Sequence, residues 1–446
     1  MEHAIAAKVT YKGLFKATIF PIFLMVFTSI YSIVDGVFVA NFAGTSGFAA
    51  INLVYPFTFV IGSLGFMVGT GGTALCAKLL GEKKDQEANG IFSSLFILTL
   101  VFGSMISLIG FFCVEPFTLG MASLSSSSSQ EMIDQAILYG RILMAGQPLF
   151  MIQFAFHPFL MAAGKTRLAF RCTLAGGLTN MALDALFIGA WSMGVAGAAA
   201  ATLIGCLASI IVPTIMFFRK DWSIHFAKPR YDFRAIGKAL MNGISEFIAN
   251  VSGSLVAIVY NIRLMAAYGE NGASAYGIIM YVSFTFSAIF IGYCLGVSPM
   301  VSYQFGAKNK GELRALFKKS LLIIGVTQVV MFGCCLGFAI PFSKIFSSGS
   351  ASLEELSTYG LRVYSISFLL CGISIFASSF FTALNNGLIS GLISLLRTLV
   401  FQLGFVLLLP LLFGANGIWW SMVVGEASAF LISLLFIIKE KKKYDY

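Results

Sequence analysis

Residues 77–92 read AKLLGEKKDQEANGIF, and residues 302–317, SYQFGAKNKGELRALF, repeat their pattern after a shift of 225 positions. The two stretches share a glycine, a lysine, a glutamate and a phenylalanine, at Gly81, Lys83, Glu87 and Phe92 and at Gly306, Lys308, Glu312 and Phe317. The match continues towards the N-terminus, where Gly44, Ala50 and Gly71 fall on Gly269, Ala275 and Gly296. These matches indicate that one unit was duplicated.

The repeat also continues towards the C-terminus, with a shorter shift. After the serine run at 125–129 the shift becomes 220, so that Gly194, Gly197 and Gly205 fall on Gly414, Gly417 and Gly425. A change of length costs little in a solvated polar connector, which is how we interpret the serine run.

The composition is that of a membrane protein. Apolar residues make up 58% of the chain and charged residues 11%, whereas a soluble protein carries about 25% charged residues. A helix needs about 20 apolar residues to cross a bilayer. Twelve stretches meet that length, six in each half: 14–40, 51–76, 91–113, 139–162, 172–191, 195–218, 239–263, 275–300, 320–340, 359–383, 391–413 and 417–438. The chain is therefore predicted to be an all-α membrane protein with twelve transmembrane helices.

Basic residues fall on one side of the predicted membrane. Of the 29 lysines and arginines, 25 precede the first stretch, follow an even-numbered stretch or end the chain. Only Arg141, Arg263, Lys344 and Arg362 lie towards the other side. Because cytoplasmic loops are enriched in Lys and Arg, both termini are predicted to be cytoplasmic. The net charge of +10 is thus a topology signal, and we expect no nucleic-acid partner.

The repeat also sets the domain organisation. We predict an N-terminal six-helix lobe at 1–218, a basic cytoplasmic linker at 219–238 and a C-terminal six-helix lobe at 239–446. Each half has an even number of spans, so both copies enter the membrane in the same direction. The lobes should therefore be related by a pseudo-two-fold axis along the membrane normal.

Asp35 is an acidic residue within the first apolar stretch. A carboxylate there costs roughly 2.5–3.5 kcal/mol on insertion scales, so it must face a cavity, a partner or a bound cation. Tyr31 lies one turn earlier on the same helical face. The alternative is a carboxyl that stays protonated in a structural hydrogen bond.

Three further polar residues complete a candidate cluster. Asn180 and Asp184 share a face of the fifth stretch by their spacing of four, and Thr202 lies in the sixth. Carboxylate, amide and hydroxyl oxygens suit a small hard cation such as Na⁺. Two nearby acids also suit proton binding, and scattered structural polar groups remain an alternative. The repeat places Asp35, Asn180, Asp184 and Thr202 opposite Tyr260, Val400, Gly404 and Met422, so that only the first half carries the cluster.

Other polar residues within the stretches are weaker candidates. Gln153 and His157 share a face of the fourth stretch, where they could line a cavity or form structural contacts. Glu246 is the acidic candidate of the second half, as an attractor of cationic substrate, as a second proton site or as an interfacial carboxyl. For Glu426 we predict a structural contact, with Arg397 as the candidate partner.

Several of these segments resemble a known family. Tyr31-Ser-Ile-Val-Asp35, with Pro21 before it and Gly44 after it, resembles the first span of the multidrug and toxic compound extrusion (MATE) transporters. Asn180-Met-Ala-Leu-Asp184, running on to Gly194-Val-Ala-Gly197-Ala-Ala-Ala-Ala-Thr202, is similar to their fifth and sixth spans. The resemblance covers essentially the whole chain. Glu246 departs from it, because serine precedes this glutamate where close relatives have proline.

The resemblance implies a V-shaped antiporter that exports cationic amphipathic drugs in exchange for Na⁺ or H⁺ by alternating access. Its first-lobe cation site maps onto Asp35, Asn180, Asp184 and Thr202. Its drug pocket lies beside that site and would include Tyr31, Gln153 and His157, with Glu246 as a further candidate. We expect no cofactor beyond the coupling ion. The expected partners are small-molecule drugs or toxic cations and membrane lipids, around a monomer in the bacterial or archaeal plasma membrane.

Two other functions fit the sequence less well. A lipid-linked oligosaccharide flippase of the same superfamily would place basic residues in the cavity to meet diphosphates, whereas the buried charges here are mostly acidic. A membrane-embedded enzyme would need a nucleophile, a metal cluster or a diphosphate motif, and the sequence shows none, so we predict that the protein is not an enzyme.

Overall fold

The computed structural model describes residues 8–123, 129–346 and 350–446, and the regular structure within these ranges is entirely helical. The first half contains α1 (Tyr11–Phe42), α2 (Gly44–Gly62), α3 (Leu64–Gly81), α4 (Asp85–Ser123), α5 (Gln130–Ala145), α6 (Gln147–Ala162), α7 (Thr166–Asp184), the π-helix η2 (Ala185–Ala190) and α8 (Gly194–Met216). Of the serine run, only Ser129 is described, and it caps α5 by accepting from the Met132 amide.

The second half repeats this order. It contains α9 (Phe233–Tyr268), α10 (Glu270–Gly306), α11 (Lys310–Gly337), α12 (Ala339–Phe346), α13 (Ala351–Ser365), α14 (Phe368–Ala383), α15 (Gly387–Leu395), the π-helix η3 (Leu396–Phe401), α16 (Gln402–Phe413) and α17 (Asn416–Tyr444).

Most of these helices are long enough to cross a membrane. Within the described residues, ten segments have the length and apolar composition of a span, and α13 with α14, bent by 52°, makes an eleventh. The α5–α6 pair, broken at Gly146, is the first-half counterpart of that bent pair. It brings each lobe to six crossings, as the sequence predicts. Several helices run beyond the apolar stretches; α4, for example, has 39 residues.

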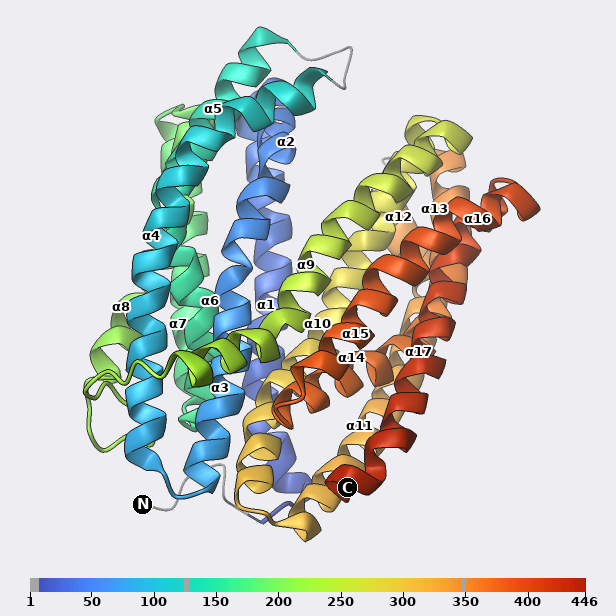
Figure 1. Ribbon diagram of the computed structural model, residues 1–446. Helices are drawn as coiled ribbons and strands as arrows, with labels where there is room; N and C mark the ends of the chain where they lie inside the picture. The colour runs from blue at the N-terminus through green and yellow to red at the C-terminus, as the bar shows by residue number, and fades with distance from the viewer. Residues whose placement is uncertain (1–7, 124–128, 347–349) are drawn as a thin grey trace.

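The molecule consists of two lobes whose helices diverge towards one end (Figure 1). At the opposite end lie the start of α1, the end of α17 and the segment between α8 and α9. We call this end, which also carries the turns at Lys83 and Lys308, the basic end.

Equivalent turns of the two halves have the same backbone conformation. Lys83 and Lys308 follow α3 and α10 with φ of 62° and 55°, in the left-handed region that non-glycine residues rarely adopt. Gly194 begins α8 with φ of 57°, and Gly414 precedes α17 with φ of 60°. These pairs are separated by the shifts of 225 and 220 read from the sequence, so the structure supports the duplication.

The segment between the lobes is fixed to the first lobe rather than free. The Arg230 amide donates to the Gly90 carbonyl at 3.1 Å, and the Ala227 amide donates to Ser93 Oγ at 2.9 Å. Asp232 then caps α9 by accepting from the amides that follow it. The last part of the predicted linker is therefore the first turns of α9.

The lobes meet at the basic end through α3 and α10. A β-carbon at Gly81 would collide with the carbonyl oxygen of Tyr303, and one at Gly306 would collide with the carbonyl oxygen of Lys78. Gly81 and Gly306 are counterparts in the repeat, so the contact is reciprocal. Only glycine permits so close an approach of two helix backbones.

Candidate functional site

The predicted first-lobe residues lie on three neighbouring helices. Asp35 is on α1, Asn180 and Asp184 are on the last turns of α7, and Thr202 is on α8. Asn180 and Asp184 are buried, with 1% and 0% of their surface exposed. A β-carbon at Gly205 would lie 2.9 Å from the Asn180 β-carbon, so α8 approaches α7 closely at this level. Thr202, three residues before Gly205, shares that side of α8.

The local sequence allows this packing. Gly177 of α7 faces Phe27 and Tyr31 of α1, and a β-carbon there would lie 2.7 Å from the Phe27 ring. The missing side chain lets α1 pack against α7 and brings Asp35 towards Asp184. The π-helix η2 begins directly after Asp184. Such wide turns are frequent at functional sites.

Asp35 and Asp184 are electrostatic neighbours across the α1–α7 contact. Asp35 Oδ1, both Asp184 carboxyl oxygens and both polar side-chain atoms of Asn180 are buried, and they bond no other group of the described residues, apart from the contact of the two carboxyl groups with each other. A buried polar atom without a partner costs about 1–3 kcal/mol. A cation, a proton or a water is the kind of partner that would satisfy such atoms on these adjacent helices.

Thr202 has a different bonding pattern. Its hydroxyl donates to the Ala198 carbonyl at 2.8 Å, which leaves the lone pairs of Oγ1 as acceptors. The cluster thus offers carboxylate, amide and hydroxyl oxygens. Within the described ranges, no three His, Cys, Asp or Glu side chains gather as a transition-metal site would require.

Three tyrosines interact electrostatically with the carboxyl groups. Tyr31 of α1 and Tyr55 of α2 are both electrostatic neighbours of Asp35, and Tyr139 of α5 is a neighbour of Asp35 and Asp184. Sequence reasoning identified Tyr31 but missed Tyr55 and Tyr139. Tyr139 matches Tyr359 in the repeat, which is the pattern of a scaffold residue.

The other first-lobe candidates lie apart from the acids. His157 of α6 is buried, and its Nε2 is 3.1 Å from Thr173 Oγ1 of α7. Thr173 lies near the middle of α7, roughly 16 Å from Asp184 along the helix axis. Gln153 is half-buried one turn before His157.

Glu246 lies in the second lobe on α9. It is half-buried, and its electrostatic neighbour is Cys294 of α10. It therefore does not join the first-lobe cluster.

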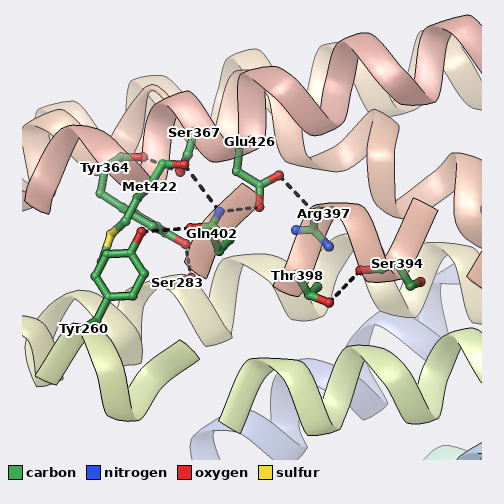
Figure 2. A network of polar contacts seen from close by, with 10 residues as sticks. All are labelled: Tyr260, Ser283, Tyr364, Ser367, Ser394, Arg397, Thr398, Gln402, Met422 and Glu426. Atoms are coloured by element: carbon green, nitrogen blue, oxygen red, sulfur yellow. Dashed lines mark hydrogen bonds and ion pairs between the residues drawn. The ribbon is translucent and has the colours of Figure 1, made fainter. Parts of the chain in front are cut away.

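The second lobe holds a hydrogen-bonded network instead of bare acids (Figure 2). The Tyr260 hydroxyl donates to Gln402 Oε1 at 3.0 Å and lies 3.1 Å from Ser421 Oγ. Gln402 Nε2 donates to Glu426 Oε1 at 3.4 Å, and Arg397 Nε donates to Glu426 Oε2 at 3.0 Å. The contact predicted between Glu426 and Arg397 is thus confirmed.

The chain matches a known protein family in both of its halves. The MatE family model covers residues 21–186 and 244–408, which are corresponding parts of the two lobes. The multidrug export protein MepA of Staphylococcus aureus is 25% identical over 412 residues, covering 92% of this chain and 89% of MepA. MepA of Staphylococcus saprophyticus is 25% identical over 425 residues, covering 93% and 91%.

Solved structures share the fold. A MATE transporter in complex with MaL6 superposes with a TM-score of 0.92 at 21% identity, covering 100% of this chain and 99% of that one. An outward-facing multidrug resistance MATE transporter gives 0.89 at 22% identity, covering 97% and 96%. A transporter from Pyrococcus furiosus, described by the reverse polarity of its binding pocket, gives 0.90 at 20% identity, covering 100% and 99%. With two matched halves, twelve crossings and two lobes, the chain belongs to the MATE family of multidrug efflux transporters.

Proposed function

We propose that this protein is an antiporter of the bacterial or archaeal plasma membrane that exports cationic amphipathic compounds in exchange for Na⁺ or H⁺. The observation that carries the proposal is the first-lobe cluster, where the carboxyl groups of Asp35 and Asp184 contact each other and bond no other group of the described residues. A cation or a proton would satisfy these oxygens and relieve the repulsion between two ionised carboxylates.

Coupling follows from the position of the acids. Asp35 lies on α1, which packs against α7 within its own lobe and against α10 of the other lobe. A cation held between Asp35 and Asp184 would draw α1 onto α7 and change the surface that α1 offers to the compound. Cation and compound would then favour different arrangements of the lobes, and that difference in affinity is the coupling free energy.

Alternating access would use the contact at the basic end. If that end is cytoplasmic, as the positive-inside rule predicts, the lobes diverge towards the outside (Figure 1). Closure around Gly81 and Gly306 would then seal the cytoplasmic side during release. This orientation places both termini inside the cell.

We propose four substrate contacts, beginning with the residue that lies beside the acids. Tyr31 stacks on Phe27 with ring centroids 6.3 Å apart and offers an aromatic face beside Asp35, which suits a cationic amphiphile. Gln153 and His157 remain predicted contacts deeper in the first lobe. Glu246 remains a predicted attractor of positive charge in the second lobe.

Reconstituted vesicles test this function. Uptake of a fluorescent cationic dye is followed under an imposed Na⁺ gradient and then under a pH gradient alone, with wild-type protein, Asp184→Asn and Asp35→Asn. We expect one gradient to drive the wild-type protein and neither gradient to drive the two variants. Asn52→Ala on α2 is the control, because the exposed Asn52 side chain bonds the Phe48 carbonyl of its own helix. Gradient-driven transport by Asp184→Asn at the wild-type rate would refute the proposal.

A further inference from the structure

The second-lobe network occupies the place that corresponds to the first-lobe cluster. Tyr260 matches Asp35 after a shift of 225, and Met422 matches Thr202 after a shift of 220. Gln402 lies between the counterparts of Asn180 and Asp184 in the repeat. It also donates to the Met422 carbonyl at 3.5 Å. Arg397 and Glu426 themselves match Gly177 and Cys206, one helical turn from Asn180 and Thr202. The two lobes can therefore be compared at neighbouring positions of one duplicated scaffold.

At this place the two lobes differ in how their acids are satisfied. Both carboxyl oxygens of Glu426 accept hydrogen bonds, Oε1 from Gln402 and Oε2 from Arg397. In the first lobe, both carboxyl oxygens of Asp184 are buried, and the group that they contact is another acid, Asp35. The second lobe thus satisfies its acid from within the protein, and the positive charge comes from Arg397.

The pair is held in the lobe interior. The side chains of Arg397 and Glu426 are 20% and 10% exposed. Arg397 lies on the π-helix η3, and Glu426 lies on α17, so the ion pair joins the fifth and sixth crossings of the second lobe. Figure 2 shows the guanidinium reaching from η3 to the carboxyl of Glu426.

We propose that Arg397 is a tethered cation that occupies, in the second lobe, the role a mobile cation has in the first. The guanidinium compensates Glu426 permanently and leaves no charge for a solution cation to bind. The second lobe therefore stays in one packing while the first lobe responds to ions. Arg397 acts through Glu426 and is a positioning residue.

Removal of the tether should create a demand for a cation. In Arg397→Ala, Glu426 loses the cation that pairs with it, and a space the size of a guanidinium opens beside it. Free guanidinium ion at low millimolar concentration should enter that space and restore the ion pair. In the double variant Arg397→Ala/Glu426→Gln no uncompensated charge remains, so guanidinium should have no effect.

The test is the thermal unfolding of purified full-length protein at mildly alkaline pH, with and without guanidinium chloride. We expect the melting temperature of Arg397→Ala to be lower than that of the wild-type protein. Guanidinium should restore most of this difference in melting temperature. The melting temperature of the double variant should be higher than that of Arg397→Ala and should not change when guanidinium is added. Arg141→Ala is the control, because Arg141 pairs with Glu115 at 2.6 Å on the exposed surface of the first lobe, and it should not respond.

Two outcomes would overturn the proposal. One is a loss in Arg397→Ala that guanidinium does not restore and that persists in the double variant, which would make Arg397 a packing residue only. The other is an equal guanidinium effect in wild-type, Arg141→Ala and Arg397→Ala, which would show binding elsewhere. If Arg397→Ala cannot be purified, the melting temperatures of Glu426→Gln and the double variant are compared instead. The proposal requires that the double variant melt at the higher temperature of the two.

A second experiment measures transport and rests on the proposed function. If the first lobe binds the coupling cation, transport by Arg397→Ala should depend on cation concentration more steeply than wild-type transport does, because a second site must fill. Guanidinium could restore the melting temperature of Arg397→Ala while neither a Na⁺ nor a pH gradient drives transport. That combined result would refute the proposed function but would still support the role of Arg397.

Discussion

The glycine contact at the basic end allows a sharp prediction about how the lobes move. In Gly81→Ala, the new β-carbon would collide with the Tyr303 carbonyl oxygen and lie 2.8 Å from the Ala307 amide nitrogen. Both obstacles are backbone atoms at the end of α10, which cannot rotate aside as a side chain would. The helices must therefore separate, and the state in which the lobes touch at this end loses stability.

The size of the effect follows from packing. Overfilling a packed contact costs typically about 1–3 kcal/mol. The gain in helix propensity from glycine to alanine is present in both states and cancels. The equilibrium between closed and separated lobes should therefore shift by roughly fivefold to 150-fold. Gly306→Ala should act in the same direction, because its β-carbon would collide with the Lys78 carbonyl.

Distances between spin labels measure this shift. Labels at Gln86 of α4 and Lys318 of α11, both exposed, report the separation of the lobes in a cysteine-free variant held in lipid nanodiscs. Gly81→Ala and Gly306→Ala should gain a longer-distance population. Gly277→Ala on α10 is the control, because nothing lies within 4 Å of its β-carbon position. Folded Gly81→Ala protein with the wild-type distance distribution would refute the reasoning.

Three further predictions concern single side chains. Thr202→Val removes one oxygen from the cluster at nearly constant volume and should cost about 0.5–1.5 kcal/mol of cation affinity. The half-saturating cation concentration should therefore rise by up to about tenfold in Thr202→Val and stay close to the wild-type value in Thr202→Ser. Equal values for the two variants would exclude Thr202 as a ligand. Glu246→Gln should raise the half-saturating concentration of cationic dyes and leave that of neutral dyes unchanged, and an equal rise for both would remove Glu246 from substrate attraction. Lys310 and Arg314 hold the pKa of the Asp445 carboxyl below its ordinary value through hydrogen bonds, so this contact stabilises the fold above the ordinary carboxyl pKa and is lost as pH falls through the lowered one. Asp445→Asn should therefore lower the melting temperature at neutral pH, with a difference that disappears in strong acid.

Much of the fold was predictable because the membrane restricts the possibilities. Apolar stretches long enough to cross a bilayer must be helical, since lipid offers no partner for backbone groups. The repeat then set six crossings per lobe, and the shared backbone of Lys83 and Lys308 shows how closely the halves correspond. Hydropathy alone merges α5 and α6 into one stretch, but Pro148, at the start of α6, is a local signal of a bend next to Gly146.

The candidate site was predictable in part. Polar and acidic side chains are costly in an apolar stretch, so the positions of Asp35, Asn180 and Asp184 alone identified them as candidate site residues. Helix spacing then placed Asn180 and Asp184 on one face. Tyr55 and Tyr139 were not predictable, because tyrosine is common in these spans and only tertiary packing selects the ones beside the acids. The π-helices were also missed. They begin at residues 185 and 396, a spacing that differs from the repeat shift of 220, so the two wide turns do not follow the repeat.

Direct cation binding tests the central claim without transport. Purified protein in detergent is titrated with Na⁺ at fixed pH, and proton release is measured in parallel, for the wild-type protein, Asp35→Asn and Asp184→Asn. We predict saturable binding or proton exchange at one site in the wild-type protein and its loss in both variants. Wild-type stoichiometry and affinity in Asp184→Asn would contradict the account, because the cation would then reside somewhere other than the first-lobe cluster.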